Sequence, residues 1–172
     1  LTMATRADVI MRIAAGATPA LLGFLGVLLL ASPIRLFGGA LPTPVIPLII
    51  IYFWSLYSPA HLPAASVFFM GILHDLLTGG PIGLWPTVYL VMQQIAISQQ
   101  AYFLGRELRV VAIGFAVACL VVSLILWLAM SLLSATLLPP GGLLWQMLVT
   151  ALCFPVFAMA FGRLHRRVVI EV

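Results

Sequence analysis

Residues 68–86, FFMGILHDLLTGGPIGLWP, contain a single formal charge, the carboxylate of Asp75. No other charged residue lies between Arg35 and Arg106, and the neighbouring positions are apolar, small or uncharged. A carboxylate in such surroundings is costly unless it is paired, hydrated or protonated, so an ionisable residue inside a membrane-type segment indicates a functional site. Asp75 is therefore the first candidate residue of this chain.

The local pattern places Asp75 at a helix end. Residues 68–77 predict a helix, and Gly79 can end it because glycine adopts the left-handed conformation without a Cβ penalty. Pro81 prevents simple continuation, and a new apolar run opens at Gly83. In the last turn of a helix, the carboxylate of Asp75 faces the negative end of the helix dipole, which is unfavourable unless another group compensates.

Composition indicates an integral membrane protein. The 172 residues are 64% hydrophobic and 7% charged, with a mean hydropathy of +1.24, whereas soluble domains are typically about 25% charged. No hydrophilic stretch could fold separately, so we expect a single transmembrane domain over residues 1–172. The net charge of +4 comes from arginines without any lysine. Because the chain has so few charged residues, this positive net charge indicates membrane topology and not a nucleic-acid partner.

Catalytic and cofactor motifs are not found in the sequence. Cys119 and Cys153 lie inside apolar runs, where a free cysteine behaves as a small hydrophobic residue. His74 and Asp75 are adjacent, but adjacent helical residues point about 100° apart and do not converge. We therefore expect no enzyme activity, no catalytic or metal-binding residues and no cofactor.

Six apolar runs predict a compact bundle of about six transmembrane helices, at residues 18–36, 45–57, 63–77, 83–104, 110–133 and 143–161. Residues 1–16 are expected to be a cytoplasmic lead-in. The runs at 45–57 and 63–77 are short, because a spanning helix needs about 20 residues. They cross only if their linkers contribute, and the alternative is a helical hairpin that does not fully cross.

The positions of the arginines favour two membrane crossings within residues 45–77. Positive residues in short loops mark the cytoplasmic side. Six crossings with an inside N-terminus place seven of the eight arginines in the cytoplasm and only Arg35 outside. A single crossing over residues 45–77 would put the loop of Arg106 and Arg109 on the opposite side. We therefore expect both termini to be cytoplasmic.

The fourth apolar run carries glutamines. Gln93 and Gln100 are seven residues apart and share a helix face, while Gln94 lies on a different one. Two interpretations remain open: the glutamines satisfy each other between helices, or they mark a polar face that meets a partner helix.

Residues 44–90 carry a resemblance to a known family. The order PLIIIYFW (47–54), Ser58-Pro59, FMGILHDLL (69–77) and GGPIGLWP (79–86) resembles the MreD family, the rod-shape-determining membrane proteins of bacteria. The most specific residues are Gly71, Asp75, Gly80, Pro81 and Gly83, in that order. The rest of the chain is similar only as hydrophobic segments of the right total length.

The resemblance implies a fold similar to the S-components of energy-coupling-factor transporters. It also implies a non-catalytic scaffold of the cell-elongation, peptidoglycan-synthesis machinery in the inner membrane, among membrane lipids. The implied partners are MreC and, through it, RodA, its class B penicillin-binding transpeptidase and MreB. Two rival functions remain: a small-molecule-binding subunit of a vitamin-type transporter, and a membrane enzyme.

Two arrangements are open for Asp75. In the six-crossing arrangement Arg35 and Asp75 lie on the same side, where an arginine–carboxylate pair can be bidentate. In the other arrangement, Asp75 accepts hydrogen bonds from backbone amides of residues 78–83 and orders that loop, while Arg35 extends to lipid phosphate. Either arrangement makes Asp75, Arg35 and His74 candidates for a structural or partner-binding role, together with the glycines and glutamines above.

Overall fold

The fold is all-α, as expected from the sequence. The computed structural model describes the backbone of residues 6–31 and 42–165 and the side chains of residues 17–31 and 42–163; Arg35 lies outside these ranges. No strand occurs in this part of the chain. The helices are α1 (Arg6–Ala31), α2 (Ile46–Tyr57), α3 (Ala64–Thr78), α4 (Leu84–Ser98), α5 (Gln100–Phe103), α6 (Leu108–Leu133) and α7 (Gly141–His165), with a 3-10 turn, η2 (Pro59–His61), before α3.

Two of the expected bounds are corrected. The helix α1 begins at Arg6, so most of the expected lead-in is helical and continues into the first apolar run. The fourth run breaks at Gln99, which separates α4 from the single turn of α5. The break coincides with side-chain bonds from this segment to α2, because Gln99 accepts a hydrogen bond from Tyr52 and Gln100 donates one to the Leu56 carbonyl.

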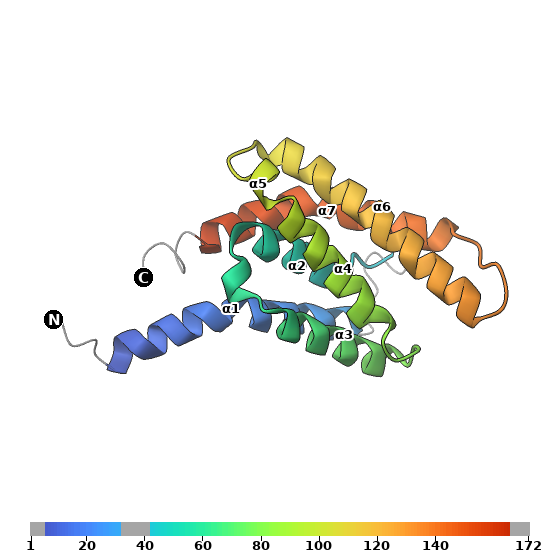
Figure 1. Ribbon diagram of the computed structural model, residues 1–172, viewed down its shortest axis with the longest axis horizontal. Coiled ribbons are helices and arrows are strands. Elements are labelled where there is room, and N and C mark those ends of the chain that lie inside the picture. The colour runs from blue at the N-terminus through green and yellow to red at the C-terminus, as the bar shows by residue number, and fades with distance from the viewer. Residues whose placement is uncertain (1–5, 32–41, 166–172) are drawn as a thin grey trace.

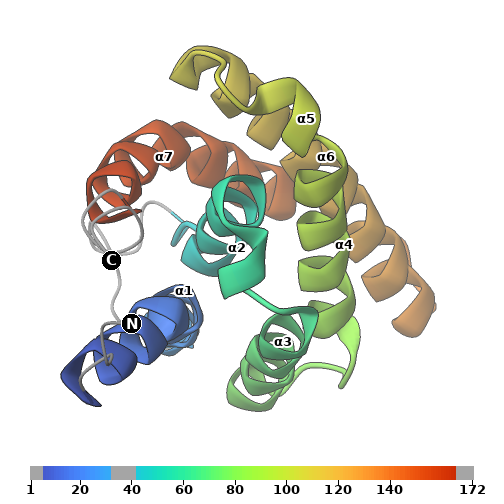
Figure 2. The same cartoon turned by 60° about the vertical axis from the view of Figure 1, so that its left-hand side comes forward.

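The short helix α2 occupies the centre of the molecule. All ten residues from 47 to 56 are buried, and α1, α4 and α7 pack around the helix (Figure 2). Twelve residues give a helix of only about 18 Å. Because other helices cover α2, it has little contact with lipid, and its length is not required to match the thickness of a bilayer.

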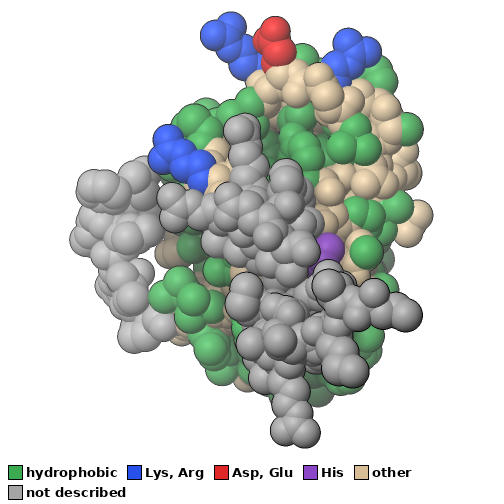
Figure 3. Space-filling model, turned by 90° about the vertical axis from the view of Figure 1, so that its left-hand side faces the viewer, with side chains coloured by type: hydrophobic (Ala, Val, Ile, Leu, Met, Phe, Trp, Pro, Cys, Tyr) green, Lys and Arg blue, Asp and Glu red, His purple; other side chains and the backbone are tan. Residues whose placement is uncertain are grey.

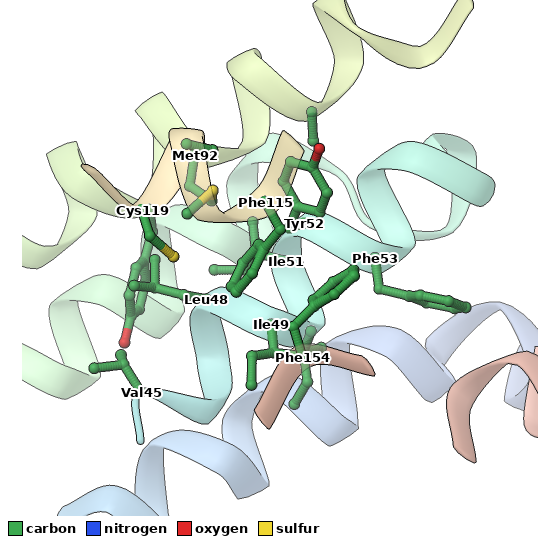
Figure 4. Packing of buried hydrophobic residues seen from close by; sticks show 14 of the residues in the cluster. Val45, Leu48, Ile49, Ile51, Tyr52, Phe53, Met92, Phe115, Cys119 and Phe154 are labelled. Carbon is green, nitrogen blue, oxygen red and sulfur yellow. The ribbon is translucent and has the colours of Figure 1, made fainter. Parts of the chain in front are cut away.

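An aromatic cluster joins α2 to α6 and α7 (Figure 4). Tyr52 of α2 makes edge contacts with Phe115 of α6 and Phe154 of α7, at centroid distances of 5.1 and 5.7 Å. Phe115 and Phe154 stack on each other at 4.4 Å. Cys119 is buried in the same core and forms no disulfide, as the sequence predicts. The cluster fixes α6 and α7 against the central helix.

Two of the described helices, α6 and α7, are long and apolar enough to cross a membrane. Their outer faces carry large exposed apolar side chains at helical spacing, including Ile113, Val117 and Leu120 on α6 and Leu148 and Leu152 on α7. A soluble monomer rarely exposes so extended an apolar surface. These helices therefore indicate association with a membrane.

Polar and apolar loops lie at opposite ends of the molecule. The start of α1, the α5–α6 turn and the end of α7 lie toward one end, whereas the α3–α4 and α6–α7 loops lie toward the other (Figure 1). Arg106, Glu107, Arg109 and Arg163 are exposed and belong to the α5–α6 turn and the end of α7. Basic and acidic side chains are visible in the view onto this end (Figure 3). We call it the basic end.

Candidate functional site

The carboxylate of Asp75 binds the start of the next helix. Its side chain is 1% exposed. Its Oδ2 accepts a hydrogen bond from the backbone N–H of Gly83 at 2.6 Å, and its Oδ1 accepts one from the N–H of Trp85 at 3.1 Å. Since α4 begins at Leu84, these amides are among the N-terminal donors that no helical carbonyl can satisfy. The positive end of α4 thus compensates the unfavourable position of Asp75 at the end of α3.

This geometry is the second of the two arrangements considered for Asp75. The bond to Gly83 falls within the expected segment, residues 78–83, and the bond to Trp85 extends beyond it. The pairing with Arg35 lies outside the described residues.

The connecting loop has the backbone that its glycines predict. Gly79 ends α3 with φ +67° and Gly83 precedes α4 with φ +102°, both in the left-handed region. Gly80 and Pro81 lie between them, with Pro81 exposed, and the Pro81 carbonyl accepts a hydrogen bond from Leu84. The chain therefore reverses within a few residues and brings the amides of α4 to Asp75.

Gly71 has a different role from the loop glycines. A Cβ atom added at this position would collide with the backbone of Pro86, at its N and Cα atoms. Gly71 thus lets α3 and α4 approach closely one turn before Asp75. The close approach and the carboxylate bonds together lock the two helices into a hairpin, which we call the α3–α4 hairpin.

His74 is held on the α4 side of this hairpin. The side chain is buried, and its Nδ1 lies 2.6 Å from the hydroxyl of Tyr89 in a hydrogen bond. Its ring stacks on Trp85 with a centroid distance of 4.0 Å and an interplanar angle of 20°. His74 and Asp75 thus bind different groups of α4, as the divergence of adjacent helical residues predicts.

The glutamines hold the other end of α4 and the turn of α5. Gln93 donates from Nε2 to the Leu62 carbonyl at 2.8 Å, and Gln100 donates to the Leu56 carbonyl at 3.0 Å. The Leu56 carbonyl lies in the last turn of α2 and the Leu62 carbonyl lies after it. At a helix end no N–H group of the next turn is present to bind such carbonyls. These contacts differ from the first of the two sequence interpretations, because the two glutamines bind backbone carbonyls of this chain and not each other.

Sequence reasoning missed the partners of these residues. Tyr89 lies four residues after Trp85 and therefore on the same helix face, a spacing that could have indicated a shared contact. The acceptors Leu56 and Leu62 have no sequence signal, because any backbone carbonyl can accept a hydrogen bond.

The buried polar side chains of the hairpin, His74, Asp75 and Gln93, are engaged within the chain. No group of three or more potential metal ligands occurs in the part of the chain that the structure describes. The surface grooves are apolar; one of about 390 Å³ between α6 and α7 has Ser123 as its only hydroxyl, among residues such as Leu120, Trp127 and Leu143. The arrangement is suited to holding helices in place.

Comparisons of the chain with protein-family models, curated proteins and solved structures found no match. The functional conclusion therefore depends on the residues, on the geometry of the α3–α4 hairpin and on the resemblance of residues 44–90.

Proposed function

We propose that this chain is a non-catalytic scaffold in the bacterial inner membrane, acting in the cell-elongation machinery as MreD-like proteins do. Its proposed direct partner is MreC, a single-pass membrane protein. Through MreC the scaffold would connect to RodA, to the class B penicillin-binding transpeptidase and to MreB.

The observation that carries this proposal is the engagement of Asp75. The residues that carry the MreD resemblance include Gly71, Asp75 and Gly83, and each has a structural task in the α3–α4 hairpin. Both carboxylate oxygens bind amides of the same chain, so the motif builds a rigid element. A rigid hairpin presenting fixed apolar faces supports a role in lateral binding of partner helices.

We also propose that the bundle crosses the membrane six times with both termini in the cytoplasm. The clustering of exposed arginines at the basic end supports this, because cytoplasmic loops are enriched in arginine. The short helices α2 and α3 would be embedded with their linkers, and the burial of α2 removes most of its contact with lipid.

The test is quantitative co-purification from gently solubilised membranes of the source bacterium. Tagged wild-type protein is expected to retain MreC and RodA, and Asp75→Ala is expected to retain less of both at equal membrane abundance. Asp8→Ala is the matched control, because it removes an aspartate from the first turn of α1, which is not part of the α3–α4 hairpin. Recovery of an energy-coupling ATPase in place of MreC would instead indicate a vitamin-type transport subunit.

A further inference from the structure

The basic end carries both cationic and apolar exposed side chains. Arg106, Glu107 and Arg109 lie on the turn between α5 and α6, and Arg163 lies in the last turn of α7. Three positive charges thus accompany one negative charge, from segments more than fifty residues apart. All four side chains are exposed, and the view onto this end shows basic and acidic side chains projecting from its surface (Figure 3).

The α5–α6 turn holds Arg106 at an interface between polar and apolar surroundings. Gly105, with φ +81°, makes the turn sharp, and the Arg106 guanidinium lies over the Tyr102 ring, 5.2 Å from its centroid. The nearby side chains of Leu104 and Ile113 are 50% and 66% exposed. Arginine and tyrosine above exposed leucine and isoleucine are the arrangement found at head-group depth in membranes.

We propose that the basic end binds the phosphate groups of anionic phospholipids through Arg106, Arg109 and Arg163. A guanidinium can bind phosphate oxygens in bidentate geometry, which an ammonium cannot, and all eight cationic residues of this chain are arginines. The exposed leucine and isoleucine favour a lipid over an acidic protein or a nucleic acid, because only a lipid supplies hydrocarbon directly below its phosphate. The inference rests on the proposed membrane location and is independent of the scaffold role.

The experiment is a titration of short-chain phosphatidylglycerol into the purified protein in zwitterionic detergent micelles, with the thermal-unfolding midpoint as readout. Phosphatidylcholine with the same acyl chains is the reference lipid. We expect phosphatidylglycerol to raise the midpoint more than phosphatidylcholine, and high salt to reduce the difference. Replacing Arg106 and Arg109 with glutamine is expected to weaken the apparent affinity about 30-fold, or about fivefold per arginine.

Two further variants test the part that the arginines play. Glu107→Gln removes the acidic neighbour and is expected to strengthen binding, while Arg106→Lys keeps the charge and is expected to retain part of the affinity that Arg106→Gln loses. Equal stabilisation of the wild type by both lipids would overturn the proposal, as would an unchanged affinity after Arg106 and Arg109 are replaced with glutamine. Either result would leave co-purification with MreC unaffected, so the two proposals fail separately.

Discussion

At the scale of single residues, Asp75 shows how a buried charge becomes a structural element. Hydrogen bonds to a charged group contribute about 1.5–3 kcal/mol each, and Asp75 makes two of them to amides that lack helical acceptors. The carboxylate thus contributes through the start of α4 and not through its own helix. Its bonds span only eight and ten residues along the chain, so the hairpin can form as a local unit.

The first prediction concerns the loss of this carboxylate. Asp75→Ala leaves two partly buried amide donors unpaired and is expected to lower the free energy of unfolding by about 3 kcal/mol. Asp75→Asn keeps one carbonyl acceptor and is expected to lose about half as much. Chemical denaturation of the purified protein in mixed micelles, followed by tryptophan fluorescence, measures both. An alanine variant as stable as Asp8→Ala would contradict the assigned role.

The second prediction separates two glycines of the same motif. Gly71→Ala places a Cβ against the backbone of Pro86, which cannot move aside without shifting α4, and is expected to cost about 2 kcal/mol. Gly80→Ala is the matched control, because its Cβ would meet nothing nearer than the Thr78 hydroxyl at 3.7 Å. Thermal-unfolding midpoints compare the two, and equal midpoints would argue against the close crossing of α3 and α4.

At the scale of elements, α4 is held at both ends by bonds to other segments. Its start binds Asp75, and Gln93 near its C-terminal end donates to the Leu62 carbonyl after α2. Directly after α4, Gln100 of α5 donates to the Leu56 carbonyl in the last turn of α2. The apolar faces alone would allow α4 to slide along its neighbours, whereas these directional bonds fix its position. The glutamines therefore act on the register of the helices.

The third prediction compares neighbouring glutamines. Gln93 is buried and bonded to Leu62, whereas Gln94 is exposed. Gln93→Leu leaves a buried carbonyl unpaired and is expected to lower the free energy of unfolding by about 1–2 kcal/mol. Gln94→Leu changes the same atoms on the outer face and is expected to be nearly neutral in micelles. Equal losses in the two variants would show that the Leu62 contact contributes nothing.

The sequence predicted elements better than contacts, for physical reasons. Apolar runs and the glycine–proline pattern set α2, α3 and the loop before α4, because these signals act within a few residues. The start of α1 at Arg6 was missed, because residues 1–16 were expected to be a lead-in to the first apolar run, and hydrophobicity gives no signal for a helix that begins before that run. The break at Gln99 was also missed, because it accompanies bonds to Tyr52 and Leu56 that only the tertiary structure brings near.

The candidate site was likewise predicted in part. The carboxylate of Asp75 was identified because its local surroundings are unfavourable, and backbone amides were one of its two expected partners. The role of Gly71 could not be read from the sequence, because it depends on the distance between α3 and α4. His74 and Tyr89 lie on different helices, and no rule of spacing links them.

At the scale of the whole molecule, the two ends differ in charge. The basic end carries Arg106, Glu107, Arg109 and Arg163, whereas the opposite end presents the α3–α4 loop and the apolar α6–α7 loop with Leu137. An apolar surface along the helices connects these ends. This distribution suits a protein that spans a bilayer with its arginines on the cytoplasmic side.

The last prediction tests that orientation directly. In a chain with Cys119 and Cys153 replaced by alanine, single cysteines are introduced at Glu107, Gly80 and Pro140 and labelled with a membrane-impermeant maleimide. Position 107 is expected to react only from the cytoplasmic side, because it adjoins two arginines. Positions 80 and 140 are expected to react only from the other side, since α4 and α6 each separate them from position 107. Labelling of 107 and 140 from the same side would show that α6 does not cross, and labelling of 107 and 80 from the same side would show that α4 with α5 does not. Because each pair brackets one crossing segment, the three positions test the two crossings independently.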